Sequence, residues 1–167
     1  MARKISLNSA YGAIGNQYFR YYDLAIAEGI TTAGQFSIRW IEKKINQYLN
    51  KLLKTDKDYV IASDTDSIYV RFDELVSMVN PKNPIDFLDT VAKEKIEPFI
   101  NKSYQQLADY VSAYDQKMFM KREVIADKGI WTAKKRYILN AHDVEGVRYK
   151  EPQLKMMGIE AVKSSTP

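Results

Sequence analysis

The chain has 167 residues, which suits one domain of ordinary size with a buried core. Its 46% hydrophobic and 28% charged residues are typical of a soluble globular protein, and no apolar run approaches the roughly 20 residues of a membrane span. Because cysteine is absent and no charged-then-apolar leader opens the chain, we expect no disulfides or thiolate metal sites, and an intracellular location. The net charge of +4 is compatible with a polyanionic partner but does not require one.

Two helices are predicted in the first third of the chain. The first begins almost at residue 1 and ends around Gly12 and Gly15. The second runs from Asp23 to about Lys54. It carries apolar or small residues at every third or fourth position, which predicts one buried face: Ile30, Ala33, Ser37, Ile41, Ile45, Tyr48 and Leu52.

A β-hairpin is predicted next. Its two arms, Tyr59–Ala62 and Ile68–Phe72, are rich in β-branched and aromatic residues, and Asp64-Thr-Asp66 lies between them. Aspartates are common in turns because their side chains bond nearby backbone groups, so an ordinary Asx-type turn is one interpretation. The other is a pair of metal-binding carboxylates held at the tip of a hairpin.

A third helical pattern follows the loop Asn80–Pro84, with apolar residues spaced at three or four positions between Leu88 and Val111. Pro98 interrupts this pattern. Since proline lacks a backbone N–H and its ring clashes with the preceding turn, we expect a kink or a break near Glu97.

The last part of the chain has a residue pattern that is typical of short strands. Residues 117–126, 130–140 and 147–150 are the predicted strands, and Asp127-Lys-Gly129 is the predicted turn between the first two. The order of elements shows no strict βαβ alternation. We therefore predict an α+β fold in which long helices cover one face of a mainly antiparallel sheet.

A polar stripe marks the first helix. Lys4, Asn8, Tyr11 and Gly12 stand at i, i+4, i+7 and i+8, which places them on one helical face. One interpretation is a lysine that extends its stem past a half-buried tyrosine near the end of the helix. The other is a surface that faces a nucleotide, with an ammonium on phosphate and an aromatic ring under a base.

A basic and aromatic cluster lies at Trp131–Tyr137. In a strand, Lys134 and Arg136 would share one face, and Trp131, Lys135 and Tyr137 the other. Cations beside aromatic residues are typical of nucleic-acid contacts. A basic edge strand that discourages aggregation is the alternative.

Three motifs in this order resemble family B DNA polymerases. Lys4-Ile-Ser-Leu-Asn-Ser-Ala-Tyr-Gly12 has the form K-x-x-x-N-S-x-Y-G, Asp64-Thr-Asp-Ser67 the form D-T-D-S, and Lys134-Lys-Arg-Tyr137 the form K-K-R-Y. Three further segments are similar in sequence to the T4-type bacteriophage branch of this family: Phe19–Leu24, Met157-Gly158 and Lys163–Pro167. The resemblance runs end to end. It implies that residues 1–15 are the end of the fingers helix and residues 16–167 a portion of the palm domain.

The resemblance also implies roles for the nucleotide-facing and metal-facing residues. Lys4 would contact the phosphates of the incoming deoxynucleoside triphosphate, Asn8 would support that face, and Tyr11 with Gly12 would lie under the nascent base pair. The carboxylates Asp64 and Asp66 would be catalytic and would bind Mg²⁺ in a two-metal site, with Asp66 the firmer ligand.

Further roles concern the DNA. By resemblance, Lys135 and Tyr137 would contact the primer-template duplex, with Lys134 and Arg136 beside them. Lys163 resembles another minor-groove lysine. Glu123 matches an acidic position close to the active site.

Several parts of the family pattern are absent. No D-x-x-S-L-Y-P segment supplies the earlier aspartate, and the exonuclease domain, most of the fingers and the thumb are missing. Lys121 stands where the phage relatives have an aspartate, and Asp127–Gly129 replaces a longer loop. We expect the isolated chain to be inactive, to act in the cytoplasm of an infected bacterial host with the remainder of the polymerase, and to self-associate through exposed apolar faces.

Other function classes stay open at this stage. A non-catalytic module could bind duplex DNA through the basic residues alone. The chain could also be one piece of a naturally split polymerase. A different metal-dependent nucleotidyl or glycosyl transferase could use the Asp-x-Asp pair, although the Lys4 stripe and the Lys134 cluster argue against it.

Overall fold

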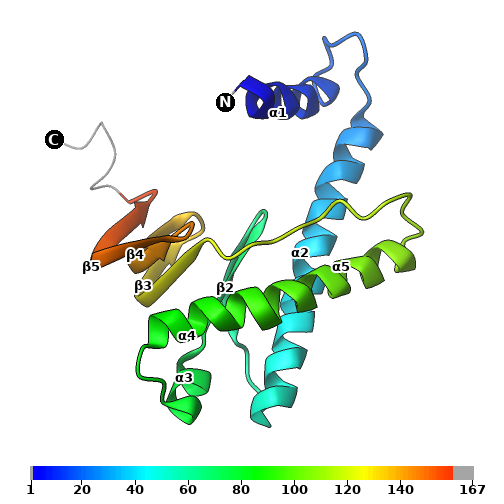
Figure 1. Ribbon diagram of the computed structural model, residues 1–167. Coiled ribbons are helices and arrows are strands. Elements are labelled where there is room, and N and C mark those ends of the chain that lie inside the picture. The colour runs from blue at the N-terminus through cyan, green and yellow to red at the C-terminus, as the bar shows by residue number, and fades with distance from the viewer. Residues whose placement is uncertain (1, 160–167) are drawn as a thin grey trace, which may run out of the picture.

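The computed structural model describes residues 2–159, and only the backbone of residues 2–4, 7 and 8. The chain forms helices and antiparallel strands, which confirms the predicted α+β class (Figure 1). The elements in chain order are α1 (Ala2–Ile14), α2 (Leu24–Leu53), β1 (Val60–Asp64), β2 (Ser67–Val70), α3 (Asp73–Val79), α4 (Pro84–Val91), the π-helix η1 (Ala92–Ile96), α5 (Glu97–Tyr110), β3 (Val124–Ala133), β4 (Arg136–Val144) and β5 (Val147–Met157).

Helix α2 matches its predicted bounds because both ends are capped. The Asp23 side chain accepts a hydrogen bond from the Ile26 N–H at 3.0 Å, and Lys54 ends the helix in the left-handed conformation with φ 56°. Ile41 and Ile45 are fully buried, as the spacing predicts. Ile30 and Leu52 are about half exposed, so the expectation of one buried face along the whole helix is wrong. The part of α2 that packs in the core is its C-terminal half, from Trp40 to Leu53, and this core is built with α5 and β1.

The core lies where α2 crosses α5. Ile41, Ile45 and Leu49 of α2 meet Ile100 and other apolar residues of α5, with Tyr59 and Val60 of the first hairpin beside them. The Trp40 indole N–H donates to the Ser103 carbonyl at 3.0 Å. This hydrogen bond joins α2 to α5. The hairpin is held at its base because Tyr59 and Val60 are part of the core.

Pro98 is accommodated by a change of helix type. Helix α4, the π-helix η1 and helix α5 follow one another as a continuous rod, and Pro98 lies in the first turn of α5 (Figure 1). Proline cannot donate to the preceding turn, and the wider π turn takes up the mismatch. The interruption is therefore located just before the predicted Glu97, as a π segment within the rod.

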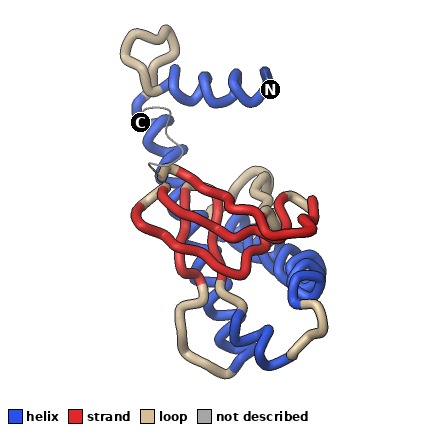
Figure 2. The backbone as a smooth tube through the Cα atoms, turned by 90° about the vertical axis from the view of Figure 1, so that its left-hand side faces the viewer, coloured by secondary structure: helices blue, strands red, loops and turns tan. Residues whose placement is uncertain are grey.

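The strands form two antiparallel sheets. One contains β1 and β2, and the other contains β3, β4 and β5 in that order. Both lie on the same side of the helices (Figure 2). In the first hairpin Asp64 pairs with Ser67, so Thr65 and Asp66 make the turn, which confirms the predicted hairpin.

The predicted turn at Asp127–Gly129 is wrong. Strand β3 continues through these residues, and Gly129 pairs with Leu139 of β4. A Cβ at position 129 would lie 2.6 Å from the Trp131 ring, so glycine is needed here for close packing and not for a change of direction. The turn lies instead at Lys134 and Lys135, where Lys135 adopts φ 62°.

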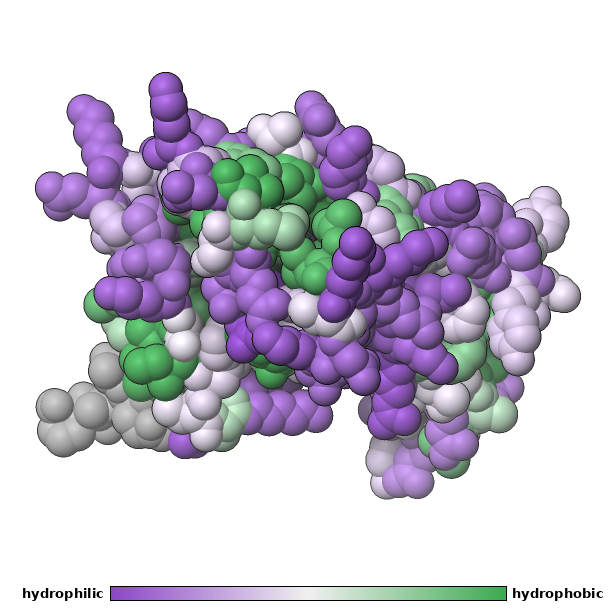
Figure 3. All heavy atoms as spheres, turned by 90° about the horizontal axis from the view of Figure 1, so that it is seen from below, coloured by the Kyte–Doolittle hydropathy of each residue, from purple (hydrophilic) through white to green (hydrophobic). Residues whose placement is uncertain are grey.

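Two further differences concern α3 and β5. Residues 73–79, between the hairpin and the loop, form a short helix that the sequence analysis does not predict, and β5 extends to Met157, well beyond residue 150. Seen from below, the surface is largely polar with patches of apolar side chains between (Figure 3). No helix within residues 2–159 is long and apolar enough to cross a membrane.

Candidate functional site

Two hairpin turns meet at a pocket of about 370 Å³. The β1–β2 turn contributes two aspartates and the β3–β4 turn contributes a lysine, while β5 closes the far side. The lining residues are Asp64, Asp66, Ser67, Tyr69, Glu123, Lys135, Tyr137, Lys155 and Met157. Five residues predicted from the sequence therefore come together: Asp64, Asp66, Glu123, Lys135 and Tyr137.

Asp64 is held as a carboxylate by its own turn. Its Oδ1 accepts hydrogen bonds from the Thr65 N–H at 2.8 Å and from the Thr65 hydroxyl at 3.1 Å, and the Lys135 Nζ lies 3.9 Å away. The Thr65 N–H has the largest effect in lowering the pKa of Asp64, and the hydroxyl and the charges of Lys135 and Lys134 lower it further. The Asx-type turn and the acidic site are thus the same structure. Asp66 is exposed at the tip of the turn.

Glu123 forms the second acidic wall of the pocket. Its carboxylate accepts a hydrogen bond from the Lys155 Nζ at 2.5 Å, and its backbone carbonyl accepts a hydrogen bond from the Glu145 N–H at 2.6 Å. Lys155 is a site residue that the sequence analysis misses. Its partner is 32 residues away in the chain, and β5 carries no local motif that marks this lysine.

Tyr69 is the second missed residue, and it joins the two hairpins. Its ring packs edge-on against Trp131 and Tyr137, with centroid distances of 5.2 and 5.4 Å. Burial raises the pKa of Tyr69 above its ordinary value, and its hydrogen bond to Tyr137 raises it further. The alternation of Ser67, Ile68 and Tyr69 could have revealed it, because a strand places residues 67 and 69 on one face.

A charge network fixes the segment that carries Glu123. The Arg122 guanidinium contacts Asp143 of β4 through Nη1 and lies 2.7 Å from Asp89 of α4 through Nη2. The Arg122 N–H donates to the Glu97 side chain at 2.9 Å. Burial opposes ionisation of Asp143, but hydrogen bonds from Arg122 and Arg148 outweigh it and lower its pKa. The network ties β4, α4 and α5 together behind the pocket.

Other predicted residues lie away from the pocket or outside the description. Lys134 and Arg136 flank Lys135 at the β3–β4 turn and are exposed. On α1, Tyr11 is exposed and Gly12 has open space around it, and neither lines the pocket. The side chains of Lys4 and Asn8, and all of Lys163, lie outside the described residues.

The donor chemistry of the pocket suits a hard cation. Asp64 and Asp66 offer the carboxylate oxygens that Mg²⁺ prefers. Within residues 2–159, however, no three His, Asp or Glu side chains are arranged to hold a metal ion. The residues present fit a magnesium site in kind but fall short of one in number.

Comparisons with known proteins cover almost the whole chain. The family model "DNA polymerase family B" matches residues 1–166. The DNA-directed DNA polymerases of Escherichia phage RB69 and Enterobacteria phage T4 are 47% and 46% identical to the chain over 180 residues, 99% of this chain in both cases. A DNA polymerase beta of African swine fever virus, isolate Tick/Malawi/Lil 20-1/1983, is 26% identical over 97% of the chain and is matched over 14% of its own length. The chain spans only 20% of the length of each phage polymerase.

Proposed function

Since the chain belongs to DNA polymerase family B, we propose that it forms part of the nucleotidyl-transfer site of a DNA-directed DNA polymerase. Residues 1–15 are the end of the fingers helix and residues 16–167 a portion of the palm, whose described strands form two antiparallel sheets. One observation carries the proposal: Asp64 and Asp66 at the first hairpin turn share a pocket with Lys135 of the basic turn.

The two aspartates hold Mg²⁺ in this proposal, with Asp66 the firmer ligand. Bound magnesium would stabilise the attacking and leaving oxygens when the primer 3′-hydroxyl displaces pyrophosphate from a deoxynucleoside triphosphate. The contacts of Asp64 with Thr65 and Lys135 all use Oδ1, which leaves Oδ2 for a cation. Glu123 adds negative charge on the opposite wall, where Lys155 fixes its orientation.

The cationic residues position the substrates. The primer-template duplex is contacted by Lys134, Lys135, Arg136, Tyr137 and Lys163. Because Lys134 and Lys135 form an exposed turn, both can approach a polyanionic backbone without rearrangement of the sheet. On α1, Lys4, Asn8, Tyr11 and Gly12 face the incoming nucleotide.

The chain needs further polypeptide for activity. An aspartate from a D-x-x-S-L-Y-P motif completes the metal site, and the fingers, exonuclease and thumb come from the rest of the polymerase. These missing parts could belong to the same polypeptide as residues 1–167, or to a separate polypeptide encoded by a split gene. The setting is the cytoplasm of an infected bacterial host, as the phage relatives suggest.

A non-catalytic role in duplex binding is the second candidate. The shortage of metal-binding side chains within residues 2–159 favours it, since the basic turn alone would suffice for binding. In an otherwise complete polymerase, duplex binding and nucleotide incorporation that are both unchanged by Asp66→Asn would support this role over the catalytic one.

Grafting tests the catalytic proposal. We expect the isolated chain to give no primer extension. The chain should retain template-dependent extension when it replaces the matching fifth of the RB69 polymerase. Extension by the isolated chain that vanishes in Asp66→Asn would contradict the need for further polypeptide, and a folded but inactive graft would contradict the assignment of the site.

A further inference from the structure

Lys155 is a cation on the buried side of the second sheet. On β5 it pairs directly with Leu139 of β4. Directly paired residues project to the same side of a sheet, and Leu139 is only 3% exposed, so Lys155 projects to the buried side as well. An ammonium group in such a place is unfavourable without a carboxylate partner. Its partner is Glu123, which lies just before β3.

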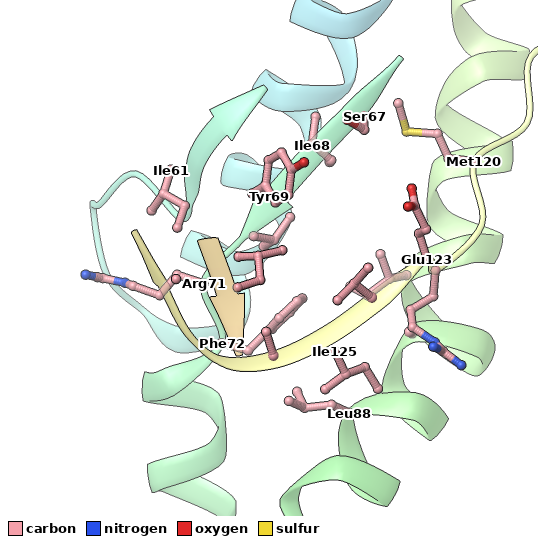
Figure 4. A pocket seen from close by; sticks show the side chains of 18 of the residues that line it. Ile61, Ser67, Ile68, Tyr69, Arg71, Phe72, Leu88, Met120, Glu123 and Ile125 are labelled. Atoms are coloured by element: carbon pink, nitrogen blue, oxygen red, sulfur yellow. The ribbon is translucent and has the colours of Figure 1, made fainter. Parts of the chain in front are cut away.

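The pair of Lys155 and Glu123 borders two spaces at once. Both residues line the 370 Å³ pocket and also a larger cleft of about 770 Å³ beside it, as Asp66 does. Figure 4 shows Glu123 across the larger cleft from Ser67 and Tyr69 of β2. The Lys155 Nζ lies 2.5 Å from the Glu123 Oε1, and the two side chains are 26% and 55% exposed. A pair that is this open to solvent can exchange partners without unfolding of the sheet.

The pocket contains its own cations beside its carboxylates. Among the described lining residues, the carboxylates are Asp64, Asp66 and Glu123 and the ammonium groups are Lys135 and Lys155, which leaves one excess negative charge. The Lys135 Nζ is 3.9 Å from Asp64, beyond hydrogen-bond distance, whereas Lys155 contacts Glu123 directly. A divalent cation is attracted by the carboxylates and repelled by the ammonium groups. Lys155 therefore competes with a cation for the charge of Glu123.

We propose that Lys155 is a positioning residue that acts as a tethered counter-ion. It holds the Glu123 carboxylate while the pocket contains no metal, and it releases this carboxylate when a divalent cation binds. The inference rests on the proposed magnesium role of Asp66 and adds a competition within this chain. Lys155 weakens cation binding by the incomplete site, and a further carboxylate from the rest of the polymerase shifts the balance toward the cation.

Titration of the purified chain with Mn²⁺ tests the competition. Mn²⁺ takes the same oxygen ligands as Mg²⁺ and broadens the NMR signals of amides close to it, so binding is followed at residues 64–67 and 123. Lys155→Met removes the ammonium group but keeps an apolar stem, and it should tighten Mn²⁺ binding about tenfold. Lys155→Arg keeps a cation for Glu123 and should stay within about threefold of the unchanged chain.

Lys150→Met is the matched control for loss of one charge from β5. Lys150 is exposed and lines neither space, so its charge is screened and its removal should change Mn²⁺ binding by less than about twofold. Equal affinity of Lys155→Met and Lys150→Met, or no Mn²⁺ broadening at the pocket in Lys155→Met, would overturn the proposal.

Glu123→Gln separates release of Glu123 from a general loss of positive charge. In this background Lys155 has no carboxylate to hold, so addition of Lys155→Met removes only its repulsion of the cation. The gain in Mn²⁺ affinity should then fall below about threefold. A gain as large as in the Glu123-containing chain would show that Lys155 acts through its charge alone and does not position Glu123.

The unchanged chain supplies a second measurement if Lys155→Met does not fold. Saturating Mg²⁺ should move the NMR signal of the Lys155 side-chain nitrogen toward its position in Glu123→Gln without Mg²⁺. A signal that Mg²⁺ leaves in place would overturn the exchange.

Asp66→Asn keeps the two proposals apart. It should abolish Mn²⁺ broadening at residues 64–67 whether residue 155 is lysine or methionine. Persistent broadening would contradict the magnesium role of Asp66, whereas equal affinity with and without Lys155 would contradict the counter-ion role alone.

Discussion

The Lys135 Nζ lies 3.9 Å from the Asp64 Oδ1, although the two residues belong to different hairpins and different sheets. The lysine reaches the aspartate because the β3–β4 turn falls at Lys134 and Lys135 and not at Gly129. In a continuous strand through residue 135 the basic residues would be spread along a sheet. At the turn they are gathered against the acidic tip of the first hairpin.

Thr65 lowers the pKa of Asp64. Because the Thr65 hydroxyl bonds the carboxylate, Thr65→Val should raise the pKa of Asp64 toward its ordinary value, while the backbone N–H keeps part of the shift. NMR titration of the Asp64 carboxyl carbon would measure the change. Thr90→Val, which removes a hydroxyl on α4 that donates to the Asp86 carbonyl, is the control and should have no effect on this pKa. No rise in Thr65→Val would mean that the hydroxyl does not stabilise the carboxylate.

The basic turn should dominate binding of the isolated chain to duplex DNA. Lys134→Ala and Lys135→Ala should each weaken binding and lower the salt dependence, by about one unit in the slope of log K against log salt. Lys43→Ala, at an exposed position of α2, is the matched control for loss of one positive charge. Fluorescence anisotropy at several salt concentrations would give the slopes. Equal losses in all three variants would show that only net charge matters.

The charge network behind the pocket should contribute strongly to stability. Asp143 is almost fully buried, and Asp143→Asn would leave Arg122 and Arg148 with less compensating charge. The free energy of unfolding should fall by about 3 kcal/mol. Lys117→Gln breaks the exposed pair between Lys117 and Asp115 and should cost less than about 1 kcal/mol. Urea unfolding would compare them, and equal losses would contradict the importance of the buried network.

The same network predicts a dependence of stability on pH. The folded-state pKa of Asp143 is lowered, so its stabilisation is complete above the ordinary unfolded value near about 4 and is lost as the pH falls through the folded value. Between about pH 5 and pH 2 the wild-type chain should therefore lose more stability than Asp143→Asn. Parallel curves for the two proteins would show that Asp143 does not contribute this dependence.

Gly129 should be intolerant of a side chain. A Cβ at this position would lie 2.6 Å from the Trp131 ring and 2.8 Å from Leu139, so Gly129→Ala should destabilise the chain by about 1–3 kcal/mol. Gly34 lies in α2 with open space around it, and Gly34→Ala should stabilise the chain by up to about 1 kcal/mol. Thermal unfolding of both variants would check the opposite signs. A neutral Gly129→Ala would contradict the close packing of Trp131.

Local patterns were sufficient to predict much of the fold. The spacing of apolar residues and the Asp23 cap define α2, and the β-branched arms around Asp64–Asp66 define the first hairpin. The wrong turn at Gly129 has a physical cause, because glycine serves both turns and close packing and the sequence alone does not distinguish them.

The long-range contacts cannot be predicted from the sequence alone. The pair between Glu123 and Lys155, and the packing of Tyr69 on Trp131, join segments far apart in the chain. Neither pair is marked by a local motif. The division of the strands into two sheets depends likewise on how the hairpins are placed over the helical rod.

The rate of a single nucleotide incorporation tests the central claim most directly. It would be measured in the RB69 polymerase that carries this chain in place of its matching fifth, with and without Asp66→Asn. If Asp66 holds magnesium, the substitution should lower the rate at least about a hundredfold. Asp56→Asn, in the exposed loop before β1, should leave the rate unchanged. An Asp66→Asn graft that incorporates nucleotide as fast as the Asp56→Asn control would contradict the account.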